Sequence, residues 1–247
     1  MVEDQVHKLA QANYSDSDSP WPEYDNWHEE TFRKESAIVE SWLGKLAKND
    51  SLILNAGSGG TDYRSPGDFV HLDIIENYVC HHEKYLVGSV EQIDSPDQTF
   101  DGVVCVGSVL NYTDAQRSIM EFSRVLKPDG FLILEFERTE SAEFLFTHNY
   151  GKDVFLKSYK YCDQTHLLWM YSETYIRRLL GFYGFGIKQN RRIHSLSSLL
   201  YRLGFSDEKA ASYAKLDKLL QPFSFPIAHN ALLLCSKKSR SAMRPRR

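Results

Sequence analysis

The 247-residue chain has few cysteines, no long apolar run and no excess of basic charge. The four cysteines are far apart and include no CxxC pair, so the sequence indicates neither a disulfide framework nor a zinc ribbon. No run approaches the 18 apolar residues of a membrane-spanning helix. The acidic start Met1-Val2-Glu3-Asp4-Gln5 lacks the apolar stretch of a secretory signal. We therefore expect a cytoplasmic protein without a transmembrane segment.

The charge balance argues against a protein that mainly binds duplex DNA. Lysine and arginine number 29 against 33 aspartate and glutamate residues, which gives a net charge of −4, whereas DNA-binding proteins usually carry a basic excess. The hydrophobic fraction of 42% and the charged fraction of 25% are typical of a globular protein and exclude collagen-like and wholly disordered chains. We expect a small-molecule partner and no specific nucleic acid; the oligomeric state is left open.

The middle of the chain alternates short apolar runs with helix-like segments, which predicts an α/β fold with a doubly wound, mostly parallel sheet. Continuous Val, Ile and Leu runs are typical of strands that are buried on both faces. Such runs occupy residues 51–55, 69–73, 101–107, 131–136 and 230–236, and further strands are predicted at 84–87 and 185–192.

Three helices are predicted from apolar spacing and capping residues. The first runs from Glu29 to Leu46. The second follows Thr113, which has capping-box spacing to Gln116, and ends at the Lys-Pro-Asp-Gly turn 127–130. The third runs to residue 180, with Ser172 as its N-cap.

The expected organisation is one main domain with appended segments. Residues 1–48 form an N-terminal arm and helix that could serve as a lid, and residues 49–237 form the main domain. Within that domain, residues 137–171 break the strand–helix rhythm and residues 195–220 form one or two amphipathic helices. The basic residues of 238–247 predict a disordered tail.

The first candidate binding site is the glycine-rich turn after the first strand, Leu54-Asn55-Ala56-Gly57-Ser58-Gly59-Gly60. Glycines let a ligand approach the backbone closely, and ligands of open α/β sheets sit at the carboxyl ends of the strands. Asp73 ends the second strand, where a carboxylate can accept hydrogen bonds from a ribose diol. Taken alone, the glycines also fit a plain tight turn, and Asp73 also fits a helix cap.

Further along the chain, Gln98-Thr99-Phe100-Asp101 opens the fourth strand, and Arg124-Val125-Leu126-Lys127-Pro128-Asp129-Gly130 precedes an apolar strand. With the glycine turn and Asp73, this order resembles the class I S-adenosylmethionine-dependent methyltransferases over about residues 50–190. More specifically, the sequence resembles a bacterial subgroup with an LNLGCG-like first motif and a shortened first helix. It implies a Rossmann-like seven-stranded sheet, with helices on both faces and an antiparallel last strand.

The resemblance also implies S-adenosylmethionine as the cofactor and a set of residues that contact it. Gly57 and Gly59 would pack against the methionine part, and Gly107 would line the sulfonium end. Asp73 would hold the ribose, and the adenine would lie among Ile74, Ser89 and Val90. Asn55 stands where the family often has a carboxylate, and the charged residues of 127–130 would only shape a turn.

Methyl transfer needs alignment of the reactants and exclusion of water, and it needs a base only when the acceptor must lose a proton. His166 is the first candidate base, with Asp163 to orient it, since histidine titrates near neutral pH. Tyr112 is the second candidate. A structural histidine and a packing tyrosine are the competing interpretations.

The adjacent residues Cys80-His81-His82 raise the question of a metal site. Neighbouring side chains project in different directions, and no further ligand has a recognisable spacing, so no metal site is predicted.

Together these features predict S-adenosylmethionine-dependent methyl transfer, an EC 2.1.1 type of activity, to a small-molecule or sugar-containing acceptor, with oxygen as the expected acceptor atom. The alternative is a non-catalytic cofactor-binding or scaffold protein with the same fold. A dinucleotide enzyme is disfavoured because GxGxxG spacing from Gly57 would need glycine where Asp62 stands.

Overall fold

A computed structural model describes residues 2–15, 26–161, 164–193 and 227–238. The helices expected within 195–220, the loop at 16–20 and most of the basic tail lie outside the described residues. In the described part, no helix has both the length and the apolarity needed to cross a membrane.

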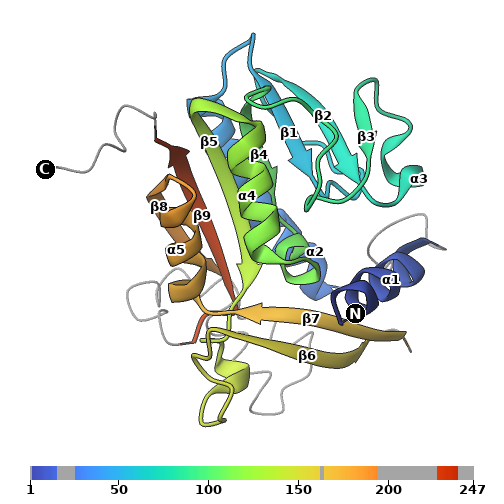
Figure 1. The fold of residues 1–247 in the computed structure, drawn as a ribbon, viewed down its shortest axis with the longest axis vertical. Helices are drawn as coiled ribbons and strands as arrows, with labels where there is room; N and C mark the ends of the chain where they lie inside the picture. The colour runs from blue at the N-terminus through green and yellow to red at the C-terminus, as the bar shows by residue number, and fades with distance from the viewer. Residues whose placement is uncertain (1, 16–25, 162–163, 194–226, 239–247) are drawn as a thin grey trace, which may run out of the picture.

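The centre of the molecule is a seven-stranded sheet with the order β3-β2-β1-β4-β5-β9-β8 (Figure 1). β9 runs antiparallel to both β5 and β8, and the other neighbours pair in parallel. This confirms the predicted Rossmann-like sheet with an antiparallel last strand. Its strands are β1 (Leu52–Ala56), β2 (Asp68–Asp73), β3 (Tyr85–Val87), β4 (Phe100–Cys105), β5 (Leu126–Glu137), β8 (Phe185–Ile193) and β9 (Asn230–Lys237).

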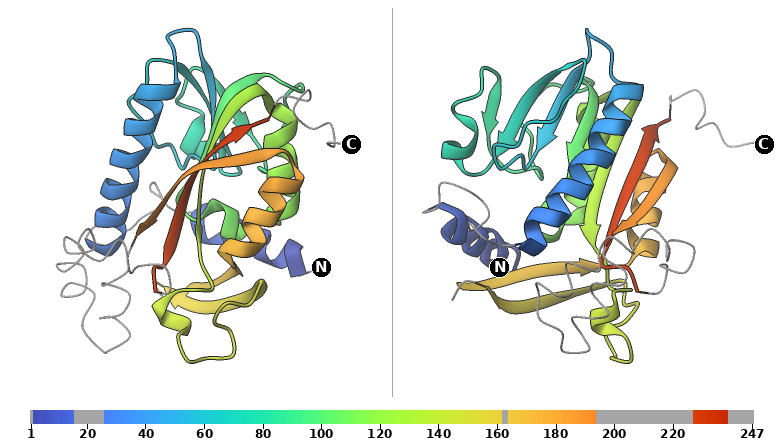
Figure 2. Two further views of the ribbon diagram at one scale, coloured as in Figure 1. Left: turned by 90° about the vertical axis from the view of Figure 1, so that its left-hand side faces the viewer. Right: turned by 180° about the vertical axis from the view of Figure 1, so that it is seen from behind.

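Helices cover both faces of this sheet. The helical elements are α1 (Val2–Ser15), α2 (Asn26–Leu46), α3 (Glu76–Val79), η1 (Val109–Tyr112), α4 (Ala115–Val125), η2 (Ala142–Phe144) and α5 (Glu173–Phe182). On one face α4 and α5 bury Phe122 and Ile176 against the sheet, and on the other α2 buries Trp42 and Leu43 (Figure 2). The continuous apolar strands are therefore explained by two cores, one on each face.

Two of the three predicted helix starts need comment. Ser172 caps α5 as expected, with its side chain accepting a hydrogen bond from the Tyr175 N–H. The predicted capping box at Thr113 is wrong: the next residue, Asp114, is the N-cap of α4 and accepts from two backbone N–H groups. The Thr113 hydroxyl instead donates to the Leu110 carbonyl of η1, because that 3₁₀ turn ends directly before the helix.

The segment that broke the strand–helix rhythm contains an antiparallel hairpin, β6 (Val154–Tyr161) with β7 (Gln164–Tyr171). Helix α1 lies within the predicted N-terminal arm and packs beside β7, with Val6 and Ala10 buried at helical spacing. The Asn13 amide donates to the Thr165 carbonyl and anchors the helix there. Figure 1 shows α1 and the hairpin together at one end of the sheet.

The Arg124–Gly130 segment lies at the opposite end of the sheet. The Lys127 ammonium contacts both carboxylate oxygens of Asp101 at 2.9 Å, and the Leu52 N–H donates to the same carboxylate. The Arg124 guanidinium binds Glu121 and the Ile93 carbonyl. These charged residues brace the amino-terminal ends of β1 and β4.

Gly102 tests how tightly β4 packs on β5. A Cβ at this position would lie 2.2 Å from the Phe131 ring, so we expect Gly102→Ala to lower the free energy of unfolding by about 1–3 kcal/mol through overpacking. Gly44 is the control, because it is exposed in α2 and a Cβ there meets nothing within 4 Å. Gly44→Ala should stabilise by about 0.5–1 kcal/mol. Urea unfolding measures both, and equal effects would contradict this packing.

Candidate functional site

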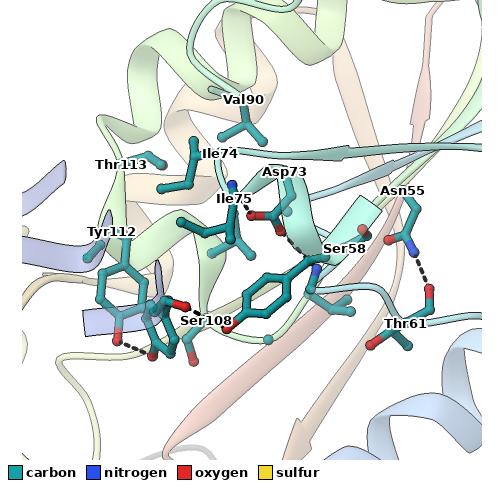
Figure 3. A pocket seen from close by; sticks show the side chains of 18 of the residues that line it. Asn55, Ser58, Thr61, Asp73, Ile74, Ile75, Val90, Ser108, Tyr112 and Thr113 are labelled. Atoms are coloured by element: carbon teal, nitrogen blue, oxygen red, sulfur yellow. Dashed lines mark hydrogen bonds between the residues drawn. The ribbon is translucent and has the colours of Figure 1, made fainter. Parts of the chain in front are cut away.

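One cavity opens at the carboxyl ends of β1, β2 and β4, where the sheet order reverses (Figure 3). This is the place where open α/β sheets bind ligands. All eight residues expected to contact a cofactor line it: Asn55, Gly57, Gly59, Asp73, Ile74, Ser89, Val90 and Gly107. Helices α1 and α2 contribute further wall residues, among them Ala10 and Phe32.

The turn after β1 depends on glycine. Gly57 has a φ of +70°, and a Cβ there would lie 2.5 Å from the Val109 side chain. The backbone at this position therefore lies against the start of η1, with no room for a side chain. A side-chain hydrogen bond stabilises the following turn: the Asn55 amide donates to the Thr61 carbonyl at 2.7 Å. Asn55 thus shapes the loop with its side chain.

Asp73 joins this turn to the end of β2. One carboxylate oxygen accepts from the Gly59 N–H at 2.8 Å, and the other accepts from the Ile75 N–H at 3.0 Å (Figure 3). Burial raises the pKa of Asp73, although the backbone N–H groups oppose that shift. Each oxygen keeps a further lone pair for a ligand hydroxyl. Ile74 and Val90 lie beside it and give the cavity an apolar flank.

Three tyrosines form the far wall, from α1, η1 and β6. The Tyr14 and Tyr112 hydroxyls are 3.0 Å apart, and the Tyr159 ring stacks on His166 with 5.2 Å between ring centroids. His166 Nδ1 lies 3.4 Å from the Tyr112 hydroxyl, but His166 is buried and does not line the cavity. The two catalytic candidates are therefore neighbours, and only Tyr112 faces the cavity. Burial raises the pKa of Tyr112, which keeps its phenol neutral.

A buried acidic group lies at the ends of β5 and β9. Glu137 pairs with His229 at 3.1 Å and accepts from the Ser108 hydroxyl. Burial raises the pKa of Glu137, but the contacts with His229 outweigh it and lower the value to about 2. Burial opposes protonation of His229, whereas Glu137 favours it, and the net result is a raised pKa. Each partner thus favours the charged form of the other.

Two more carboxyl groups stand nearby in the fold. Glu135 accepts from the Ser108 N–H and the Asn230 amide, and burial raises its pKa to about 7. Glu35 of α2 lines the cavity, and burial together with the charges of Glu135 and Glu137 raises its pKa well above the ordinary value. This end of the cavity thus combines an ion pair with two carboxyl groups whose raised pKa values favour their neutral forms.

Sequence reasoning missed Tyr14, Glu35, Glu137, Tyr159 and His229, all of which line the cavity. They come from five separate elements or loops, and β5 meets the start of β9 only through antiparallel pairing of Glu137 with Asn230. The acidic alternation Glu135-Phe136-Glu137 at a predicted strand end was the one available signal. It would have placed two carboxyl groups at the site edge.

Comparison with known sequences identifies a match to the methyltransferase domain family over residues 62–134. A ubiquinone/menaquinone biosynthesis C-methyltransferase, UbiE of Marinomonas sp. (strain MWYL1), is 37% identical over 59 residues, which are 24% of each chain. The chain thus spans about a quarter of the length of the curated relatives it matches.

Solved structures share the fold. The Burkholderia thailandensis 1,6-didemethyltoxoflavin-N1-methyltransferase, determined with its substrate and S-adenosylhomocysteine, has a TM-score of 0.53 and 16% identity. The match covers 96% of this chain and 88% of that one. The cyclase SpnF also has a TM-score of 0.53 and 16% identity, with 81% and 80% covered. At these identities the likeness establishes the architecture.

The Glu137–His229 pair predicts a pH-dependent stability. The stabilisation that comes from the raised pKa of His229 is fully present below about pH 6.5, the pKa of histidine in an unfolded chain. It is lost as the pH rises through the higher pKa of His229 in the folded protein. The stabilisation that comes from the lowered pKa of Glu137 is present above the pKa of glutamate in the unfolded chain. It is lost as the pH falls toward about 2, the pKa of Glu137 in the folded protein. We expect His229→Gln to cost about 3–5 kcal/mol near pH 6 and less at pH 9.

Urea unfolding at a series of pH values measures this difference. His148→Gln, which removes an exposed imidazole of a loop, should show no such dependence. A His229→Gln penalty that is constant from pH 6 to pH 9 would contradict the ion pair.

Proposed function

We propose that the chain is a class I S-adenosylmethionine-dependent methyltransferase that transfers the cofactor's methyl group to a hydroxyl oxygen of a small-molecule or sugar-containing acceptor. One observation carries the proposal. The glycine turn and Asp73 share a single cavity with a wall of tyrosine, glutamate and histidine side chains. A cofactor and an acceptor can therefore meet in one space.

The chain's own residues suit the cofactor. Gly57 and Gly59 line the cavity, where the methionine part would lie along their backbone, and the free lone pairs of Asp73 suit a ribose diol. Ile74 and Val90 supply an apolar slot for adenine, with Ser89 beside them. When bound, S-adenosylmethionine supplies a methyl group that its positive sulfonium already activates.

In this proposal the acceptor binds against the three tyrosines of the cavity wall. The Tyr112 hydroxyl accepts a hydrogen bond from the acceptor hydroxyl and orients its oxygen, since Tyr112 lines the cavity and is held by Tyr14. His166 acts through Tyr112 as a positioning residue and takes the proton that Tyr112 passes on. An oxygen acceptor needs such a proton path, whereas a neutral amine attacks without losing a proton first.

Helix α1 covers the site in this scheme. Its residue His7 bonds Glu91 at 3.1 Å, and Tyr14 reaches Tyr112, so the helix touches both ends of the cavity wall. The contact excludes water from the reacting atoms, which is the main contribution a protein makes to displacement at a sulfonium methyl.

The cofactor site is tested with Asp73→Asn. We expect this change to weaken S-adenosylmethionine and S-adenosylhomocysteine by about 1–3 kcal/mol, the worth of hydrogen bonds to a charged group. Calorimetric titration of the purified chain measures it. Asp68→Asn, in the exposed first position of the same strand, is the matched control and should bind as wild type. Absence of binding by folded wild-type protein would overturn the proposal.

The acceptor side is tested by release of S-adenosylhomocysteine with pools of phenols, hydroxy acids, sugars and amines. With the best hydroxyl acceptor, Tyr112→Phe should lower kcat about 100-fold, a typical loss for proton transfer, and leave cofactor affinity unchanged. His166→Gln should lower kcat and alter the pH profile. The exposed Tyr85→Phe is the control.

Two results would count against this assignment. Activity with amines alone would move the acceptor atom from oxygen to nitrogen. Tight cofactor binding without transfer to any pool would favour the scaffold alternative.

A further inference from the structure

Two histidines and an aspartate meet outside the cavity, beside β2. Asp62 Oδ1 lies 3.4 Å from His71 Nε2 and 3.8 Å from His82 Nδ1. One ligand atom from each of the three residues falls within 4.8 Å of the other two. The His71 and His82 rings stack with 3.5 Å between centroids and 5° between planes. Three metal-ligating side chains from three separate segments therefore converge on one point.

The position of this group follows from the connection between β1 and β2. Parallel strands are usually joined through a helix, but residues 57–67 form none. His71 pairs with Asn55 in the β1–β2 register, so both side chains lie on the α2 face. There the loop supplies Asp62 and the chain after α3 supplies His82. The Asp62–His71–His82 cluster thus fills a place that a crossover helix would otherwise cover.

The nitrogens that face the carboxylate are the ones a metal ion would bind. His71 is 3% exposed, and its Nε2 and the Nδ1 of His82 both lie on the side of Asp62. Their separations from Asp62 Oδ1, 3.4 and 3.8 Å, are longer than a good N–H···O hydrogen bond. Burial, with the adjacent His82, lowers the pKa of His71 to about 4, so the ring is in the neutral form that binds metals at pH 7.

We propose that Asp62, His71 and His82 bind one divalent transition-metal ion, for which Zn²⁺ is the natural probe. Imidazole nitrogen and carboxylate oxygen are ligands that Zn²⁺ prefers, and three protein ligands leave one position for water. Ligand atoms around a tetrahedral Zn²⁺ lie about 3.3 Å apart, close to the 3.4 and 3.8 Å found here. Binding requires the stacked rings to tilt so that both lone pairs point at the ion.

The site would tie the cofactor loop to the sheet. Asp62 follows Thr61, whose carbonyl is held by Asn55 and which lines the cavity. A Cβ at Gly60 would lie 3.5 Å from the ring of His81, so the loop also rests on the histidine segment. An ion at the cluster would limit the motion of the loop that carries Gly59. Zn²⁺ should therefore raise cofactor affinity, and the cofactor should raise Zn²⁺ affinity equally; this coupling rests on the proposed function.

The experiment uses the full, untagged chain after treatment with a chelator. ZnCl₂ is titrated by calorimetry without any cofactor, into wild type, Asp62→Asn, His82→Gln and the control His148→Gln, whose imidazole is exposed elsewhere. We expect one ion per wild-type chain and an affinity at least about tenfold lower in both cluster variants, since even the loss of an outer-shell partner costs that much. The control should match wild type.

Asp62→Asn keeps the test valid if His82→Gln fails to fold, because the Asp62 side chain is 74% exposed. Circular dichroism confirms folding of each variant. The absence of saturable one-to-one binding by folded wild type would overturn the site, and so would unchanged affinity in Asp62→Asn. Since Zn²⁺ is measured alone, this failure is separate from a failure to bind S-adenosylmethionine.

Discussion

The carboxylate of Asp73 is the contact on which the site depends. It takes one backbone N–H from the glycine turn and one from the chain after β2, so it closes a strand–loop–strand connection that has no helix to support it. Gly57 allows the turn to lie against η1, which links the loop to β4. A side chain at Gly57 would push this loop away from Val109 of η1 and so displace one wall of the cavity.

The second organising feature is the junction of β5 with β9. Because β5 and β9 pair antiparallel, the end of β5 lies beside the start of β9, and Glu137 contacts His229 in the segment just before β9. Ser108, at a φ of +59° after β4, bonds both Glu135 and Glu137 through its backbone and hydroxyl. The glutamates at this end of the cavity are thus held in place by two central strands of the sheet. Such placement favours a fixed electrostatic environment for a cationic ligand.

Elements peripheral to the sheet complete the acceptor side. The hairpin β6–β7 presents Tyr159 and His166, and α1 brings Tyr14 against Tyr112. These segments bury less apolar surface than the central sheet, whose core residues are almost fully enclosed. Variation of acceptor among proteins of one fold is carried by such additions, because the fold itself supports many functions.

Local patterns in the sequence predicted the parallel sheet and the position of the glycine-rich turn. These patterns are apolar runs, glycines after a strand and an acidic strand end such as Asp73. The antiparallel last strand was predicted only through the family resemblance. The cap of α5 at Ser172 followed from the same kind of local rule. At Thr113 that rule failed, because the hydroxyl of Thr113 bonds the preceding 3₁₀ turn and Asp114 caps α4 instead.

Only the tertiary structure decided which side chains face the cavity beyond that turn. Glu35, Glu137 and His229 approach one another because helix packing and antiparallel pairing join distant segments. His166 was identified by type, but the pleat of β7 turns it behind Tyr112, which sequence spacing in an irregular region does not reveal. Asp62, His71 and His82 likewise meet across a loop and a strand, since their contact depends on the course of the backbone and has no fixed spacing in the chain.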